Sequence, residues 1–166
     1  LDVGAAVGEL RTRSGVREIR LIGHRLGGAL AALHCLRERS VSHLVLSRSI
    51  LNGEQYLAEI LISHQEWLRG SFTDSQRNRK GREIQGFPLT TTLEKELCQI
   101  DLVNTNESVA ERILAIESSP AAEDFERFTS RQKRLGASVE SRVMTKDEIR
   151  REQTSNIVSW LKESVR

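Results

Sequence analysis

A strand-like segment, a glycine-flanked turn and a helical pattern follow one another within residues 17–33, and this order constrains the fold more than any other feature of the chain. The turn, residues 23–27, reads Gly-His-Arg-Leu-Gly and has Arg25 at its apex. The residues after it repeat leucine and alanine at helical spacing. A strand that passes through a turn into a helix begins a β-α-β unit, and such units pair their strands in parallel. The segment therefore predicts an α/β fold with a parallel sheet.

The turn has the spacing of the G-x-S-x-G nucleophile elbow, but arginine occupies the place of serine. In that motif the two glycines leave room for a strained turn that lifts the nucleophile to the top of a sheet. Gly23 and Gly27 hold those places. A guanidinium stays protonated at any working pH, so Arg25 cannot attack a carbonyl as serine does. We therefore predict a hydrolase-like scaffold without its usual reaction.

Strand and helix patterns continue to alternate after the turn. We expect strands at residues 43–47, 112–117 and 137–144, and helices at residues 26–37, 54–67, 92–100, 118–136 and 157–161. The side chains that should face the sheet from the first of these helices are Leu26, Leu30, Leu33 and Cys35. Thr91 or Thr92 should cap the helix at 92–100. The pattern predicts four parallel strands with flanking helices.

The chain opens within a helical pattern, in which Ala5, Ala6, Val7 and Leu10 share one side and Gly15 marks the end. Because a parallel sheet cannot begin with a lone helix, we expect the C-terminal part of a larger fold, with its N-terminal strands missing. An exposed sheet edge would then favour self-association. We expect one partial domain over residues 1–166, with a basic mobile loop at 69–84 and a cap-like insertion at 85–110.

Composition narrows the class of protein further. The chain has 166 residues and a net charge of +2, which is too small to suggest a nucleic-acid partner. Cys35 and Cys98 lie in helical patterns without C-x-x-C spacing, so neither a disulfide framework nor a zinc site is expected, and no cofactor or metal is predicted. Without an apolar run long enough to cross a bilayer, and without a signal peptide at the start, the sequence predicts a cytoplasmic location.

Three segments together carry a resemblance to a known family. They are residues 23–30 (GHRLGGAL), residues 44–53 (LVLSRSILNG) and residues 85–89 (QGFPL). The chain resembles the α/β-hydrolase-like proteins found with bacterial exosortase systems, of which one branch carries a G-x-R-x-G elbow. Family members usually end the second strand in a Trp-Asp-Pro or Trp-Gln-Pro style, where this chain has Ser-Arg-Ser at 47–49. That departure removes an acid from the top of the sheet.

The resemblance implies positions for a catalytic triad, and this chain does not fill them. Arg25 stands at the nucleophile position, and the family's acid corresponds to Glu117 or Asp124. Glu117 can equally be the last residue of a strand, and Asp124 can be a first-turn charge that favours the helix dipole. The histidine should follow the last strand near residues 144–147, but the histidines are His24, His34, His43 and His64. We therefore expect no ordinary triad mechanism.

Parts of an oxyanion site can survive around the apex. The backbone N–H of Leu26 and the start of the helix at Gly27 would provide partial positive charge, and Arg25 would add a full one. Such a site would bind a carboxylate, a phosphate or the headgroup of an acylated compound. Alternatively, Arg25 forms a structural ion pair with a neighbouring loop. His24 is the candidate for residual chemistry, and the alternative is a packing residue beneath the turn.

Three functions follow from these residues. The first is a catalytically inert hydrolase homologue that binds a small anionic or acyl ligand or a partner protein. The second is a weak ester or thioester hydrolase in which His24 activates water. The third is a truncated or decayed homologue. Displaced nucleophiles at Cys35 or Cys98 are not expected, because both lie within helices, and Trp67 and Trp160 are expected to anchor helices in the core.

Overall fold

The computed structural model describes residues 3–39, 41–71, 83–84, 86–118, 123–145 and 157–162. The chain divides into two compact units, Leu1–Leu51 with Leu102–Arg166, and Asn52–Asp101. Each unit is described by itself below. Within the described ranges no helix is long and apolar enough to cross a membrane.

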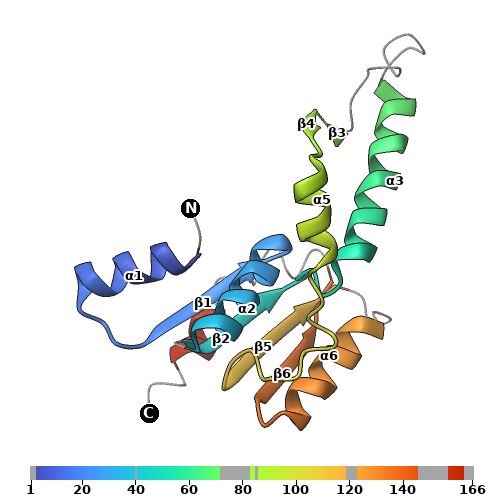
Figure 1. The fold of residues 1–166 in the computed structure, drawn as a ribbon. Helices are drawn as coiled ribbons and strands as arrows, with labels where there is room; N and C mark the ends of the chain where they lie inside the picture. The colour runs from blue at the N-terminus through green and yellow to red at the C-terminus, as the bar shows by residue number, and fades with distance from the viewer. Residues whose placement is uncertain are drawn as a thin grey trace. The chain divides into compact units, whose positions relative to one another are not determined.

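The larger unit is built on a four-stranded parallel sheet in the order β1-β2-β5-β6 (Figure 1). Its strands are β1 (Ile19–His24), β2 (Val41–Ser47), β5 (Arg112–Glu117) and β6 (Ser138–Val143). Its helices are α1 (Val3–Ser14), α2 (Leu26–Glu38) and α6 (Glu123–Arg134), and residues 157–162 are also helical. The predicted α/β class and the four parallel strands are confirmed.

Helices lie on both faces of this sheet (Figure 1). Successive strand residues point to opposite sides, so each strand offers side chains to both layers of helices. On one face α2 packs on β1 and β2, while α6 packs on β6. On the other face the segment 157–162 contributes Ile157 and Trp160 to a core with Val45, Leu114 and Ile116. Apolar side chains of β2 and β5 therefore form the centre of the unit.

The predicted buried face of α2 is only partly right. Cys35 is buried and Leu26 and Leu33 are half-buried, but Leu30 is 47% exposed. The residues that α2 buries are mostly small: Gly28, Ala29, Ala31, Ala32, His34 and Cys35. Small side chains let the helix lie close to the strands, which leaves no room for Leu30 between them.

The first helix buries less than its pattern predicts. Only Val7 of α1 is buried, whereas Ala5, Ala6 and Leu10 are exposed. Gly15 has a positive φ of 67°, as expected for a residue that ends a helix in the left-handed conformation. The end of α1 was therefore predictable, but the face that it buries was not.

The smaller unit holds α3 (Gly53–Ser71), the hairpin β3 (Glu83–Ile84) with β4 (Phe87–Pro88), and α5 (Thr91–Cys98). Its helices pack closely, because a Cβ on Gly53 would lie 1.7 Å from the carbonyl oxygen of Leu97. The N-cap of α5 is Thr90, whose hydroxyl accepts from the Leu93 N–H at 3.1 Å, not Thr91 or Thr92 as predicted.

The unit Asn52–Asp101 begins well before the insertion predicted at 85–110. Residues 69–71, which the sequence assigned to a basic loop, complete α3, and residues 83–84 are a strand. The remainder of that loop, residues 72–82, lies outside the described residues, as do residues 119–122 at the expected start of the helix at 118–136. The loop's predicted mobility therefore stays a prediction.

Candidate functional site

The carboxyl ends of parallel strands meet at one edge of a sheet, where α/β proteins place their ligands. At this edge His24 is the last residue of β1, Ser47 of β2 and Glu117 of β5. Arg25 follows directly after β1. The register pairs His24 with Ser47. The sheet therefore brings the candidate residues of the turn together with the ends of β2 and β5.

Arg25 adopts the strained conformation of a nucleophile elbow, with φ 50° and ψ −123°. Its N–H donates to the carbonyl of Ser47 at 3.1 Å. Its own carbonyl accepts from the N–H groups of Gly28 at 3.0 Å and Ile50 at 3.3 Å. A non-glycine residue in such a region costs on the order of 1–3 kcal/mol, and these bonds hold it there. The turn therefore has the shape of an elbow, with arginine at its apex.

Gly23 and Gly28 allow the strand and the helix to approach each other closely, whereas the motif predicted Gly23 and Gly27. A Cβ on Gly23 would lie 2.3 Å from the Cα of Gly28. A Cβ on Gly28 would lie 1.8 Å from the Ser49 Oγ. Around Gly27, by contrast, a Cβ would meet nothing within 4 Å. Gly23 and Gly28 therefore allow the packing, and Gly27 lies in open space.

The Arg25 side chain is exposed and forms no hydrogen bond or ion pair with any residue that the structure describes. The structural ion pair that the sequence left open gains no support among those residues. Leu26 and Gly27 open α2, so their backbone N–H groups have no acceptor within the helix. An exposed guanidinium without a partner among the described residues and N–H groups without an acceptor in the helix thus lie next to each other in sequence at the elbow.

His24 is exposed, so it is not the packing residue beneath the turn that one alternative proposed. Its Nδ1 lies 3.3 Å from the Oγ of Ser47. Ser47 itself is fully buried at 0% exposure, so its hydroxyl is not open to a substrate, and its contact with Nδ1 helps to orient the imidazole. Sequence reasoning missed this contact, although aligning the ends of the two predicted strands would have suggested it.

Neither candidate acid reaches a histidine in the described part of the chain. The Glu117 carboxylate accepts from the N–H of Ser118 at 2.6 Å and from its hydroxyl at 3.2 Å. Asp124 pairs with Arg127 at 3.5 Å, one turn along α6. Both carboxylates therefore have local structural partners, and neither forms an acid–histidine pair with a described residue.

The opposite edge of the sheet holds serine, histidine and glutamate together, in an arrangement that sequence reasoning did not foresee. The Ser42 hydroxyl lies 2.8 Å from the Nδ1 of His43 and donates to Glu18 at 3.0 Å. The same Nδ1 lies 3.2 Å from the Glu18 carboxylate. In a triad, histidine uses one nitrogen for the nucleophile and the other for the acid. Here both partners approach Nδ1, so the cluster is not a triad.

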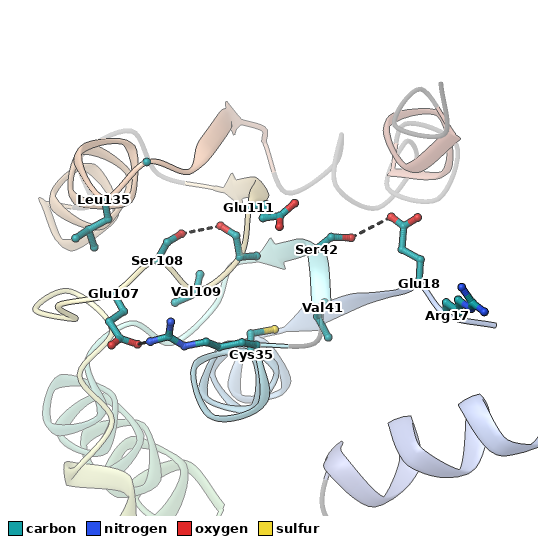
Figure 2. Close-up of a pocket in the computed structure, with 13 residues that line it drawn as sticks. Arg17, Glu18, Cys35, Val41, Ser42, Glu107, Ser108, Val109, Glu111 and Leu135 are labelled. Carbon is teal, nitrogen blue, oxygen red and sulfur yellow. Dashed lines mark hydrogen bonds and ion pairs between the residues drawn. The ribbon is translucent and has the colours of Figure 1, made fainter. Parts of the chain in front are cut away.

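A hollow of about 730 Å³ opens at this amino-terminal edge (Figure 2). Several of its polar groups pair with one another: Arg39 with Glu107, and the Ser108 hydroxyl with the carbonyl of Ala110 at 2.6 Å. Burial raises the pKa of Cys35, which also lines the hollow, to about 12. That thiol therefore stays protonated and is not a nucleophile. Within the described ranges, no three histidine, cysteine or acidic side chains gather as a metal site would require.

Comparison with known proteins identifies the fold. No protein-family model and no curated protein sequence matches the chain. A hydrolase from Pseudomonas aeruginosa PA01 superposes with a TM-score of 0.54 and 18% identity, over 96% of this chain and 70% of that one. MGS-MChE2, an alpha/beta hydrolase enzyme from a lagoon-sediment metagenome of Mar Chica, Morocco, superposes with a TM-score of 0.56 and 19% identity, over 96% and 68%. The chain therefore has an α/β-hydrolase-like fold.

Proposed function

We propose that this chain is a catalytically inert α/β-hydrolase-like protein that binds a small anionic or acyl ligand at the elbow. The observation that carries the proposal is Arg25, an exposed cation held at the apex of a nucleophile elbow. The fold supplies the position of a reactive residue, and the residue present there binds anions well but does not attack carbonyl groups.

The elbow offers two kinds of group to an anion. The first turn of α2 presents the N–H groups of Leu26 and Gly27, which have no acceptor within the helix, together with the positive end of the helix dipole. The Arg25 guanidinium can add a bidentate pair of hydrogen bonds to a carboxylate or phosphate. An acyl ligand would place its carboxylate or phosphate headgroup against these donors.

The same edge supports the proposal of inertness. Ser47 is buried, and His24 contacts that hydroxyl instead of an acid. Among the described residues no accessible nucleophile lies beside an oriented base, so acyl transfer by a covalent intermediate has no first step there. An exposed His24 still favours one alternative, a weak ester or thioester hydrolase in which the imidazole activates water.

We also propose that the chain belongs to the exosortase-associated branch and works in the bacterial cytoplasm, with the arginine elbow and the 44–53 segment as support. A partner protein in polysaccharide export or protein sorting is the corresponding alternative to a small ligand. Copurification with export or sorting components from a bacterial lysate, lost in Arg25→Ala, would favour a partner at this site.

Binding is tested by the melting temperature in the presence of acetate, phosphate or octanoate. A ligand that binds only the folded state raises stability by mass action, by about 2.7 kcal/mol at roughly 100 times its Kd. We expect the shift in the unaltered protein and in Arg37→Ala, which removes an exposed cation from the far end of α2, but not in Arg25→Ala. An equal shift in Arg25→Ala would place the anion elsewhere and refute the elbow site.

Inertness is tested by hydrolysis of a short-chain nitrophenyl ester. The unaltered protein should give the rate of the buffer, as should Arg25→Ala and His24→Ala. A rate above buffer that disappears only in His24→Ala would overturn inertness and establish the weak hydrolase. The binding and hydrolysis experiments fail independently, so each half of the proposal can be rejected alone.

A further inference from the structure

The helical segment 157–162 packs on the sheet through Ile157 and Trp160. Trp160 is 3% exposed and packs with Ile157 against Val45 and Leu114. Its ring meets the imidazole of His43 edge to face, with centroids 5.8 Å apart and planes at 73°. The Arg112 guanidinium lies 5.5 Å from the Trp160 ring centre. A titratable ring is therefore part of the surface that receives this segment.

His43 is 6% exposed, and its two nitrogens have different surroundings. Because Ser42 donates its hydroxyl proton to Glu18, the hydrogen-bond pattern assigns the imidazole proton to Nδ1, which lies 2.8 Å from the Ser42 oxygen. Nε2 is then bare, and it is buried without a hydrogen-bond partner in the described part of the chain. A proton added to Nε2 would find no acceptor there.

Charged side chains of both signs from the neighbouring strands and loops act on the pKa of His43. Arg20 of β1 and Arg112 of β5 oppose a further positive charge, while Glu18 and Glu111 favour it. The segment 157–162 contributes the Trp160 ring, which has no acceptor to offer Nε2. Burial is the main cause that lowers the pKa of His43 below its ordinary value, and Arg20 adds to it.

We propose that His43 makes the docking of segment 157–162 pH-sensitive, so that protonation of Nε2 releases Trp160 from the sheet. A buried N–H that lacks an acceptor must reach water, and the ring packed against the imidazole is that of Trp160. The protonated ring would also stand among the guanidinium groups of Arg20 and Arg112. Both effects weaken the docked state more than the released state, in which water surrounds the imidazole.

The sign of the pH dependence follows from proton linkage. The docked state holds His43 at a lowered pKa, and the released state returns it toward the ordinary value of 6.5. Docking is therefore at full strength above 6.5 and weakens as the pH falls below it. As the pH falls from 6.5 toward the lowered pKa of docked His43, the ratio of released to docked protein rises by up to about tenfold for each pH unit.

The test uses a protein whose only tryptophan is Trp160. The chain has two tryptophans, so Trp67→Phe leaves Trp160 as the single reporter. Acrylamide quenching of its fluorescence should increase between about pH 8 and about pH 5.5, while circular dichroism still reports a folded sheet. Adding His43→Phe, which keeps a ring against Trp160 but cannot be protonated, should remove the increase. His24→Gln, which removes an exposed histidine, should leave it unchanged.

Two results would overturn the proposal. One is a flat quenching profile in the folded Trp67→Phe protein, and the other is an unchanged profile after His43→Phe. If His43→Phe does not fold, the His43 ring is titrated by NMR in the Trp67→Phe protein. An apparent pKa at or above 6.5 would show that docking does not oppose protonation and would equally reject the proposal.

Discussion

Arg25 has a backbone conformation that glycine adopts at a lower free-energy cost than arginine. Its φ of 50° with ψ of −123° falls in a sparsely populated region, yet the residue there carries a long side chain. Hydrogen bonds from Gly28 and Ile50 to the Arg25 carbonyl keep the turn in place. The strain therefore belongs to the backbone of the turn and does not depend on the chemistry of the side chain.

Replacing Arg25 by glycine should stabilise the protein. Relief of strain of about 1–3 kcal/mol exceeds the entropic cost of glycine, about 0.5–1 kcal/mol, so urea unfolding should report a gain of about 1 kcal/mol. Arg37→Gly, within regular helix, should instead lose about 1 kcal/mol. If Arg25→Gly were no more stable than Arg25→Ala, the elbow would not be strained.

Placing serine at the apex should not create a catalyst. In Arg25→Ser the hydroxyl would find no acid–histidine pair among the described residues, because His24 contacts Ser47 and Glu117 is bonded to Ser118. We expect nitrophenyl ester hydrolysis to stay within a few-fold of the rate of Arg25→Ala, where a working triad would add on the order of 10⁶-fold. A fast Arg25→Ser enzyme would reveal a base that is not assembled in the described residues.

At the scale of elements, the contact between β1 and α2 depends on glycine at two of three nearby positions. Gly23→Ala would force a Cβ against the backbone of Gly28 and should cost about 1–3 kcal/mol or more. Gly27→Ala meets nothing and should leave stability unchanged or raise it by up to about 1 kcal/mol. Urea unfolding of the two variants checks this contrast, and equal losses would contradict the geometry.

Much of the element order could be predicted, because β2 and β5 are apolar runs and the elbow is bounded by glycines. The buried face of α2 could not, since the pattern of leucines favoured Leu30 while close packing selected the small residues. The cap of α5 differs by one residue, because neighbouring threonines are equivalent in sequence and only the backbone path selects Thr90.

The site was predictable only where it depends on local sequence. Arg25 at the apex follows from spacing alone. The contact between His24 and Ser47 requires the register of β1 against β2, and the cluster of Ser42 with Glu18 requires the order of strands in the sheet. Side chains that meet through tertiary pairing leave no periodic signal in one sequence, so these contacts were found only in the folded chain.

For the whole molecule, the two edges of the sheet differ in a way that bears on association. β6 carries Glu140 and Arg142, which pair at 2.6 Å and place charge on that edge. β1 pairs only with β2 among the described strands, and Ile22 on it is 55% exposed. Charged side chains discourage strand addition, whereas an exposed apolar side chain such as Ile22 favours it.

Self-association through the β1 edge therefore stays a prediction of this architecture. Sedimentation velocity should show concentration-dependent dimers that Ile22→Lys weakens, because a charge on an open edge strand opposes pairing. Val143→Lys, at the end of the opposite edge strand, is the matched control and should leave the distribution unchanged. A monomer at all concentrations would reject association through either edge.

The contact between Gly23 and Gly28 has a practical consequence for protein engineering. Because these glycines allow the close approach that shapes the turn, position 25 can accept different side chains without rebuilding the sheet or the helix. A designer could therefore install a synthetic amino acid there, with a reactive group of choice, and inherit a ready-made site beside a helix N-terminus.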